Sequence, residues 1–221
     1  MTRIYLAGFV LFVTMCAALS TSWDATSLPL SWLVRDRLLV LTGLLAISSM
    51  SAAMLLGIRP KWLCDRLGGP RAVVPLHKWS GILAAGFALL HWLVEMSDEV
   101  LEALFGDASE PHGGRGQLLH MLREAAEELG EFAIFVLFAL VLLALWRHPA
   151  LTPLRKLHRA MPLLYLGLLF HAIVLTPTSY WTQPLGFLLV GLGAAGGWSA
   201  CLSLARLAYP AAPRLDGGNS R

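Results

Sequence analysis

Apolar residues are grouped into six runs along the chain, and charged residues fall almost entirely between them. The runs cover about residues 4–20, 38–58, 79–95, 132–146, 160–176 and 185–205. Runs of this kind approach the ~20 apolar residues that cross a bilayer as a helix, and only helices of this type satisfy their own backbone hydrogen bonds in lipid. The pattern therefore predicts an all-α integral membrane protein, built as a bundle of six transmembrane helices.

The composition agrees with this pattern. The chain has 221 residues, of which 57% are hydrophobic and 14% charged, and its mean hydropathy is +0.64. Soluble domains carry about a quarter charged residues. The first run could instead be a cleavable signal peptide, because Arg3 precedes an apolar core and small residues follow it. We favour a retained helix, because an even number of spans places both termini on one side.

Basic residues are divided unequally between the loops. Of the 17 lysines and arginines, 13 fall on the side of the two termini. The opposite side has Arg35, Arg37, Arg115 and Arg123. By the positive-inside rule this predicts cytoplasmic termini, in a multi-pass protein of the cell inner (plasma) membrane. The lipid bilayer is the expected partner, and no nucleic acid is expected, because the topology accounts for the basic residues.

Two short patterns suggest chemistry that their context excludes. The letters GLGAAG, from Gly191 to Gly196, match the dinucleotide pattern GxGxxG, but that fingerprint requires a preceding strand. Here it lies inside the sixth apolar run, where small residues let helices pack closely, so we reject a nucleotide site. Cys16, Cys64 and Cys201 form no CxxC or CxxCH motif, so we expect neither a disulfide framework nor covalent haem attachment.

The segment between the third and fourth runs, about residues 96–131, is long and acidic. It begins with a cluster of carboxylates, and its four glutamates between Glu124 and Glu131 line a predicted helix that leads into the fourth run. We favour a solvated outer cap, and the alternative is an electrostatic funnel for a cationic substrate. His112 and His120 also lie in this segment, at a spacing that is unspecific for a metal.

Four of the seven histidines frame two of the apolar runs. His77 and His91 bracket the third run (HKWSGILAAGFALLH), and His158 and His171 bracket the fifth (HRAMPLLYLGLLFH). The first spacing separates its histidines by ~21 Å along a helix and returns nearly to the same face. The second gives ~20 Å, but with faces about 140° apart in an ideal helix. Pro162 can change the local twist, because proline removes a backbone hydrogen bond.

The predicted topology places His77 and His158 near the cytoplasm, and His91 and His171 near the outside. Two facing imidazole pairs, stacked across the membrane, suit two b-type haems, each iron held by one histidine from each helix. Ionisable side chains at membrane depth usually mark function. A zinc site would gather three or four ligands at one point, and a proton relay would be expected to include buried carboxylates, so we rank both below the haem interpretation.

Residues beside the inner histidines complete the predicted site. Lys78, Arg155 and Arg159 are placed to pair with haem propionates near the inner surface. Three glycines, which have no side chain, could let a macrocycle approach the backbone: Gly81, Gly86 and Gly167.

With these spacings the chain resembles ferric reductase-like transmembrane domains, the six-helix di-haem core shared by ferric reductases and NADPH oxidases. In that family the third span carries H-x13-H and the fifth H-x12-H, and both are present here as His77/His91 and His158/His171. The dipeptide HR at His158 and the turn TPTSYWTQP also agree. The resemblance covers about residues 4–208.

The resemblance implies transmembrane electron transfer by an oxidoreductase. A cytoplasmic FAD reduced by NAD(P)H would pass electrons to the inner haem and then to the outer haem, and ferric iron or oxygen would accept them. Residues 1–208 would form the six-helix di-haem transmembrane domain. Residues 209–221 would form a cytoplasmic tail, the linker to a flavin reductase domain that is missing here or is a separate protein.

A second relative is the haem-binding membrane subunit of the bacterial periplasmic methionine sulfoxide reductase system, which has six spans and no flavin domain. It implies an alternative function, in which the chain passes electrons to a periplasmic partner reductase. In that group the position of His77 often lacks histidine, so the intact pair favours the ferric reductase branch, whereas the chain length favours the second relative. A quinol-linked cytochrome b is a third hypothesis, since that class also places four histidines on two helices.

Overall fold

The structure is a computed structural model that describes residues 2–20, 30–105, 117–146 and 154–209, with residues 154 and 155 described by their backbone alone. All regular elements in these residues are helical. They are α1 (Thr2–Leu19), α2 (Leu30–Ile58), α3 (Lys61–Leu67), α4 (Pro70–Glu95), α5 (Asp98–Phe105), α6 (Gln117–Leu145), the 3₁₀ helix η2 (Leu154–Ala160), α7 (Met161–Leu175), the 3₁₀ turn η3 (Thr178–Tyr180) and α8 (Pro184–Ala208). Six helical segments are long and apolar enough to cross a membrane, which confirms the predicted fold class.

Several helices are longer than the apolar runs that predicted them. Helix α2 begins at Leu30 instead of about residue 38, α4 at Pro70 instead of 79, and α6 at Gln117 instead of 132. The 29 residues of α6 span about 44 Å, well beyond the ~30 Å of hydrocarbon in a bilayer. Hydropathy marks only the part of a helix that is apolar enough for lipid. The polar turns at the start of α2, α4 and α6 were therefore not included in the predicted helices. The glutamate-rich segment before the fourth run is helical, as predicted.

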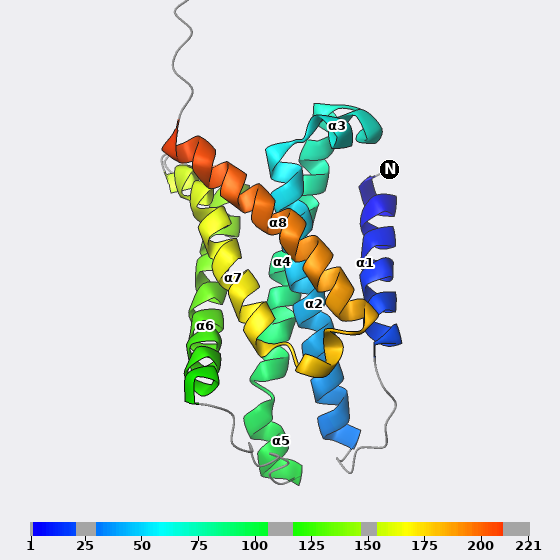
Figure 1. Ribbon diagram of the computed structural model, residues 1–221, viewed down its shortest axis with the longest axis vertical. Helices are drawn as coiled ribbons and strands as arrows, with labels where there is room; N and C mark the ends of the chain where they lie inside the picture. Colours follow the sequence, from blue (N-terminus) through cyan, green and yellow to red (C-terminus); the bar gives the residue numbers. More distant parts are fainter. Residues whose placement is uncertain (1, 21–29, 106–116, 147–153, 210–221) are drawn as a thin grey trace, which may run out of the picture.

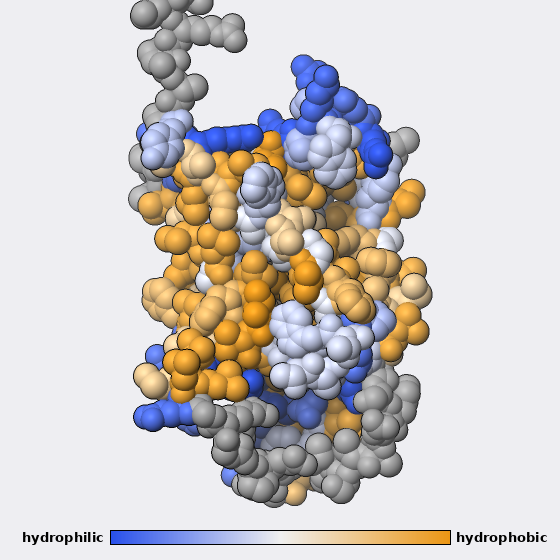
Figure 2. All heavy atoms as spheres, in the orientation of Figure 1, coloured by the Kyte–Doolittle hydropathy of each residue, from blue (hydrophilic) through white to orange (hydrophobic). Residues whose placement is uncertain are grey.

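The bundle is arranged around α2 and α4, which run side by side through its centre (Figure 1). Helix α7 pairs with α6 on one flank, α1 lies on the other, and α8 crosses α2 and α7 diagonally. The start of α1, the end of α8 and the short helix α3 lie at one end of the bundle, and α5 and η3 lie at the other. A wide apolar band covers the middle of the visible face, between polar ends (Figure 2).

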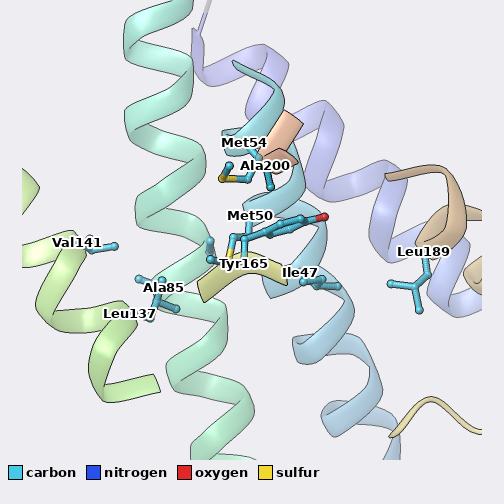
Figure 3. Close-up of a cluster of buried hydrophobic side chains, with 10 residues drawn as sticks. Ile47, Met50, Met54, Ala85, Leu137, Val141, Tyr165, Leu189 and Ala200 are labelled. Atoms are coloured by element: carbon cyan, nitrogen blue, oxygen red, sulfur yellow. The ribbon is translucent and has the colours of Figure 1, made fainter. Parts of the chain in front are cut away.

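The core of the bundle is built around a buried tyrosine on α7. Tyr165 is completely buried, and Ile47, Met50, Leu137 and Leu189 pack in the same cluster (Figure 3). Its hydroxyl lies 2.9 Å from the Oγ atom of Ser51 on α2 and 3.4 Å from the carbonyl oxygen of Gly193 on α8. A buried tyrosine needs such partners, so this side chain links three helices.

The glycines of the GLGAAG motif lie within α8, where they allow this packing. A Cβ atom at Gly196 would overlap the Tyr165 hydroxyl and lie 2.6 Å from its Cζ atom. A Cβ atom at Gly193 would lie 3.0 Å from Leu169. The motif therefore serves helix packing, in agreement with the rejection of a nucleotide site.

Helix α1 packs into the bundle through its last turns. Val13 and Ala17 are buried against α2 and α8. The Ser20 hydroxyl donates a hydrogen bond to the Cys16 carbonyl at 2.8 Å and accepts one from the backbone N–H of Leu185 at 2.8 Å. That N–H belongs to the first turn of α8, where helical backbone donors have no partner of their own, so Ser20 joins the end of α1 to the start of α8.

Candidate electron-transfer site

Four histidines meet in two pairs at two levels of the bundle. At the first level His77 of α4 faces His158 of η2, with ring centroids 6.4 Å apart and planes at 84°. At the second level His91 of α4 faces His171 of α7, also at 6.4 Å, with planes at 89°. His91 comes 14 positions after His77, which separates the levels by about 21 Å along α4. The pairs are those expected from the sequence.

A change of helix type reduces the difference in direction between His158 and His171. His158 lies in the 3₁₀ helix η2, and the α-helix α7 begins at Met161 with Pro162 in its first turn. A 3₁₀ helix turns about 120° per residue, compared with about 100° in an α-helix. The tighter segment therefore removes part of the ~140° mismatch that an ideal helix would impose. Proline at this place is favourable, because the first turn of a helix needs no N–H donor.

Three of the four histidines are held by backbone carbonyl groups of the neighbouring helix. The Nδ1 atom of His77 lies 2.8 Å from the carbonyl oxygen of Ala53 on α2. The Nδ1 atom of His171 lies 2.7 Å from the carbonyl oxygen of Ala126 on α6. A carbonyl oxygen can only accept a hydrogen bond, so Nδ1 carries the proton and Nε2 carries the free lone pair.

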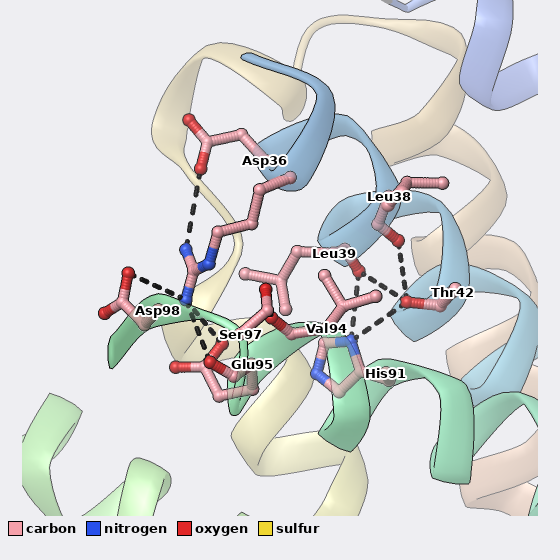
Figure 4. Close-up of polar contacts among 10 residues, drawn as sticks. Asp36, Leu38, Leu39, Thr42, His91, Val94, Glu95, Ser97 and Asp98 are labelled. Atoms are coloured by element: carbon pink, nitrogen blue, oxygen red, sulfur yellow. Dashed lines mark hydrogen bonds and ion pairs between the residues drawn. The ribbon is translucent and has the colours of Figure 1, made fainter. Parts of the chain in front are cut away.

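His91 makes the equivalent bond at the second level. Its Nδ1 atom donates to the carbonyl oxygen of Leu39 on α2 at 3.0 Å, and the Thr42 hydroxyl lies 3.4 Å away (Figure 4). The Thr42 hydroxyl itself donates to the Leu38 carbonyl oxygen at 2.7 Å. All three supported rings thus present Nε2 as the atom able to bind a metal, in the tautomer that metal-ligating histidines usually adopt.

Three glycines of the carbonyl-bearing helices lie against these imidazoles, and the sequence analysis missed them. A Cβ atom would lie 3.0 Å from His91 at Gly43, 3.5 Å from His77 at Gly57, and 2.5 Å from His171 at Gly130. Gly43 and Gly130 therefore make room for a ring, whereas at Gly57 a Cβ atom would be in ordinary van der Waals contact with the imidazole. The signal in the sequence was the spacing of Gly43 and Gly57, which equals that of His77 and His91.

The geometry of both pairs fits a metal bound between two imidazoles. On each side of a bound ion, a metal–nitrogen bond of about 2.0–2.1 Å is followed by about 1.2 Å from that nitrogen to the centre of its ring. The centres of two rings on opposite sides of one ion are therefore about 6.4 Å apart. Both pairs have this separation, and neutral imidazole on opposite sides of an iron is a common haem ligation. Among the described residues, no three His, Cys, Asp or Glu side chains group as a metal site, so the zinc alternative has no ligand set there.

Comparison with protein families agrees with this arrangement. The family model described as ferric reductase like transmembrane component matches residues 42–169, more than half of the chain. The chain belongs to the ferric reductase-like transmembrane family. The matched region contains His77, His91 and His158 and ends just before His171. No curated protein and no solved structure matches the chain.

Membership of the ferric reductase-like family makes the chain an oxidoreductase-related, multi-pass membrane protein, and its domain type points to electron transfer across the membrane. Lys78 and Arg159, the basic residues beside the inner histidines, have exposed side chains. The side chain of Arg155, His112 and the predicted tail after Tyr209 lie outside the described residues.

The three glycines expected to face a macrocycle differ in their surroundings. A Cβ atom at Gly81 or Gly86 would meet no described atom within 4 Å, so both adjoin open space. A Cβ atom at Gly167 would lie 3.5 Å from Leu129. Gly167 therefore faces the side chain of α6, because α6 and α7 pack closely, and the expectation of open small surface there was wrong.

At the end that carries α5, an arginine of α2 is surrounded by carboxylates. The Arg35 side chain is 10% exposed, and its guanidinium lies 3.3 Å from Asp98, 3.6 Å from Glu95 and 3.8 Å from Asp36 (Figure 4). It also donates a hydrogen bond to the Glu95 carbonyl oxygen at 3.2 Å and lies 5.9 Å from the centre of the Trp32 ring. This cluster joins α2 to α4 and α5. It lies close to the second histidine level, because Glu95 is four residues after His91 on the same helix.

Proposed function

We propose that the chain carries electrons across the membrane through two stacked b-type haems. His77 and His158 would hold the inner haem iron, and His91 and His171 the outer haem iron. The observation that carries the proposal is the repetition of one geometry at two levels, with rings 6.4 Å apart and nearly perpendicular. One histidine pair could arise from packing alone, whereas two equal pairs on the same two segments are difficult to explain without a shared ligand.

The residues of the chain have separate roles in this proposal. When bound, haem supplies an iron that takes up and releases one electron at a time. The histidines hold the metal through Nε2 and are oriented through Nδ1 by helix carbonyls. Lys78 and Arg159, each following an inner histidine in sequence, would pair with propionates at the inner surface.

The donor and the acceptor lie outside the described chain. We propose a cytoplasmic flavin reductase, as a further domain or a separate protein with FAD and NAD(P)H, at the end that carries α3. The described residues at that end include nine lysines and arginines and one acidic residue, the charge expected of a cytoplasmic face. Ferric iron or oxygen would accept electrons at the opposite end.

A second candidate function is supported by the charge of that opposite end. Its described residues include nine carboxylates, namely Asp36, Glu95, Asp98, Glu99, Glu102, Glu124, Glu127, Glu128 and Glu131, and three arginines. Such a surface attracts basic molecules. A haem-binding membrane subunit that passes electrons to a periplasmic partner reductase would use it for docking.

Haem content per polypeptide, with reduced-minus-oxidised spectra of the detergent-purified chain, tests the proposal. Two b-type haems with low-spin, bis-histidine spectra are expected. One haem would leave one of the two histidine pairs with a purely structural role and would favour the second candidate. A folded preparation without haem would refute the proposal.

A further inference from the structure

The carbonyl groups that orient the histidines repeat along each of two helices. On α2 the acceptors belong to Leu39 and Ala53, and on α6 the first acceptor belongs to Ala126. Leu39 and Ala53 are 14 residues apart, and the residue 14 positions after Ala126 is Leu140. Its carbonyl group lies near His158, in a contact that does not reach the distance and angle of a hydrogen bond. Helices α2 and α6 therefore offer one carbonyl group to each of the four histidines.

A small residue follows each carbonyl at a constant distance. Four residues after Leu39, Ala53 and Ala126 come Gly43, Gly57 and Gly130, the glycines that touch the imidazoles. The reason is helical geometry, because the carbonyl of residue i points towards residue i+4. A side chain that reaches the second lone pair of that oxygen must pass over position i+4.

The fourth position departs from this rule. Four residues after Leu140 the chain has Ala144 in place of glycine. The Nδ1 atom of His158 is buried and has no hydrogen-bond partner among the described residues. At Gly43 and Gly130 a Cβ atom would lie 3.0 and 2.5 Å from the nearest ring atom, closer than ordinary van der Waals contact, and at Gly57 it would lie at 3.5 Å. A methyl group at the corresponding place on α6 would therefore press on the imidazole and hold it away from the carbonyl.

We propose that Ala144 leaves His158 unsupported and makes it the weaker ligand of the inner pair. The proposal rests on the proposed haem function. A hydrogen bond from Nδ1 makes the imidazole a more basic ligand, and such outer partners change metal affinity by about 10–100-fold. His77, His91 and His171 have this bond, whereas the Nδ1 atom of His158 has no hydrogen-bond partner in the part of the chain that the structure describes.

Two properties of the inner haem follow from this asymmetry. A less basic ligand stabilises ferric iron less, so the inner haem has a higher reduction potential than it would have with both ligands supported. His158 is also the ligand that an added small molecule displaces first. Ala144 and the three glycines are thus positioning residues, which act on the iron through the histidines.

The test replaces Ala144 by glycine and isolates the inner haem. In a His91→Leu background only the inner haem remains. Its midpoint potential, and the displacement of its histidine ligand by carbon monoxide, can then be measured without a signal from the outer haem. Ala144→Gly should lower the midpoint potential and raise the carbon monoxide concentration needed for half-displacement by about tenfold or more. Ala139→Gly is the matched control, because Ala139 lies on the same helix with an exposed side chain, and it should change neither quantity.

A reciprocal variant keeps the test decisive. Gly130→Ala in a His77→Leu background should raise the midpoint potential of the remaining outer haem and lower the carbon monoxide concentration that displaces its histidine ligand. Gly167→Ala in the same background should change neither quantity. If both haems are present but Ala144→Gly behaves like Ala139→Gly, the inference on His158 is overturned and the proposed function stands. If the unmodified chain holds no pair of haems, the proposed function itself fails.

Discussion

The hydroxyl of Tyr165 lies 2.9 Å from the Ser51 hydroxyl, at a depth between the two histidine levels. Ser51 donates its own proton to the Ile47 carbonyl oxygen at 2.8 Å, so the phenol proton is available to Ser51 and to the more distant carbonyl of Gly193. Tyr165 comes seven residues after His158 and six before His171. The contact therefore holds α2 and α8 against α7, which carries His171 and directly follows the segment η2 that carries His158.

Gly196→Ala is expected to destabilise the bundle by about 1–3 kcal/mol, the usual cost of overpacking a core. The added methyl group would overlap the Tyr165 hydroxyl and approach the Ser51 Cα atom to 3.0 Å. Unfolding of the purified protein in a graded denaturing detergent measures the change. Gly191→Ala is the control on the same helix, because a Cβ atom there meets no described atom within 4 Å.

A second substitution shows whether Tyr165 causes that loss. Tyr165→Phe alone removes one interhelical hydrogen bond, with an expected cost of about 0.6–1.5 kcal/mol. Combined with Gly196→Ala, it removes the atom that the methyl group overlaps, so the double variant should lose less stability than the two single losses together. Strict additivity would contradict the predicted contact.

His91→Leu should remove one haem and leave the other with its spectrum largely intact. His171→Leu should produce the same single loss, because the two rings face each other at one level. The pyridine haemochrome of each purified variant gives the number of haems per chain. His120→Leu is the control, since His120 has an exposed side chain that pairs with Glu124 at 3.2 Å. Loss of both haems on changing His91, in a folded protein, would contradict the assignment of separate levels.

Arg35→Gln is expected to destabilise the end of the bundle that carries α5 by about 1–2 kcal/mol. The three carboxylates around Arg35 are more than half exposed, so each ion pair contributes at most about 1 kcal/mol. The effect should shrink in 1 M salt, because screening weakens exposed pairs. Arg71→Gln, a change of an exposed arginine at the opposite end, should stay within about 0.5 kcal/mol. Equal losses for both variants would remove the structural role of Arg35.

The acidic end of the bundle, which carries α5, predicts that small cationic oxidants accept electrons faster than anionic oxidants. Stopped-flow oxidation of the dithionite-reduced protein by hexaammineruthenium(III) and by ferricyanide measures this, and the difference should fall as ionic strength rises. Replacing Glu124, Glu127 and Glu128 by glutamine should reduce the preference, whereas Asp65→Asn at the other end should not. A preference that is independent of salt would exclude electrostatic attraction as its cause.

Much of the architecture could be predicted from local patterns. Six apolar runs predicted six membrane-crossing helices, and the spacing of His77 to His91 predicted two imidazoles on one helix face. Helix bounds were less accurate at the ends that carry Arg35 and Glu124, because these turns leave the lipid while the helix continues. Hydropathy indicates which residues suit a lipid environment. It does not indicate where a helix ends, because a helix can continue from lipid into water.

The partners of the histidines could not be predicted in the same way. Gly43, Gly57 and Gly130 were missed, while Gly167, which faces Leu129, was expected to border open space. Glycines are common in membrane helices, and only the rotation of α2 against α4 and of α6 against α7 decides which of them meet an imidazole.

By itself, the sequence determined the membrane class, the number of spans, the unequal charge of the two ends and the depths of the four histidines. All of these follow from composition and from the constant rise of a helix. The tertiary structure alone decided which helix carbonyl groups hold His77, His91 and His171, that Tyr165 packs against Gly196, and that Ala144 stands where the other three histidines have glycine. These relationships depend on how helices rotate and cross, which packing of whole surfaces determines and no local pattern records.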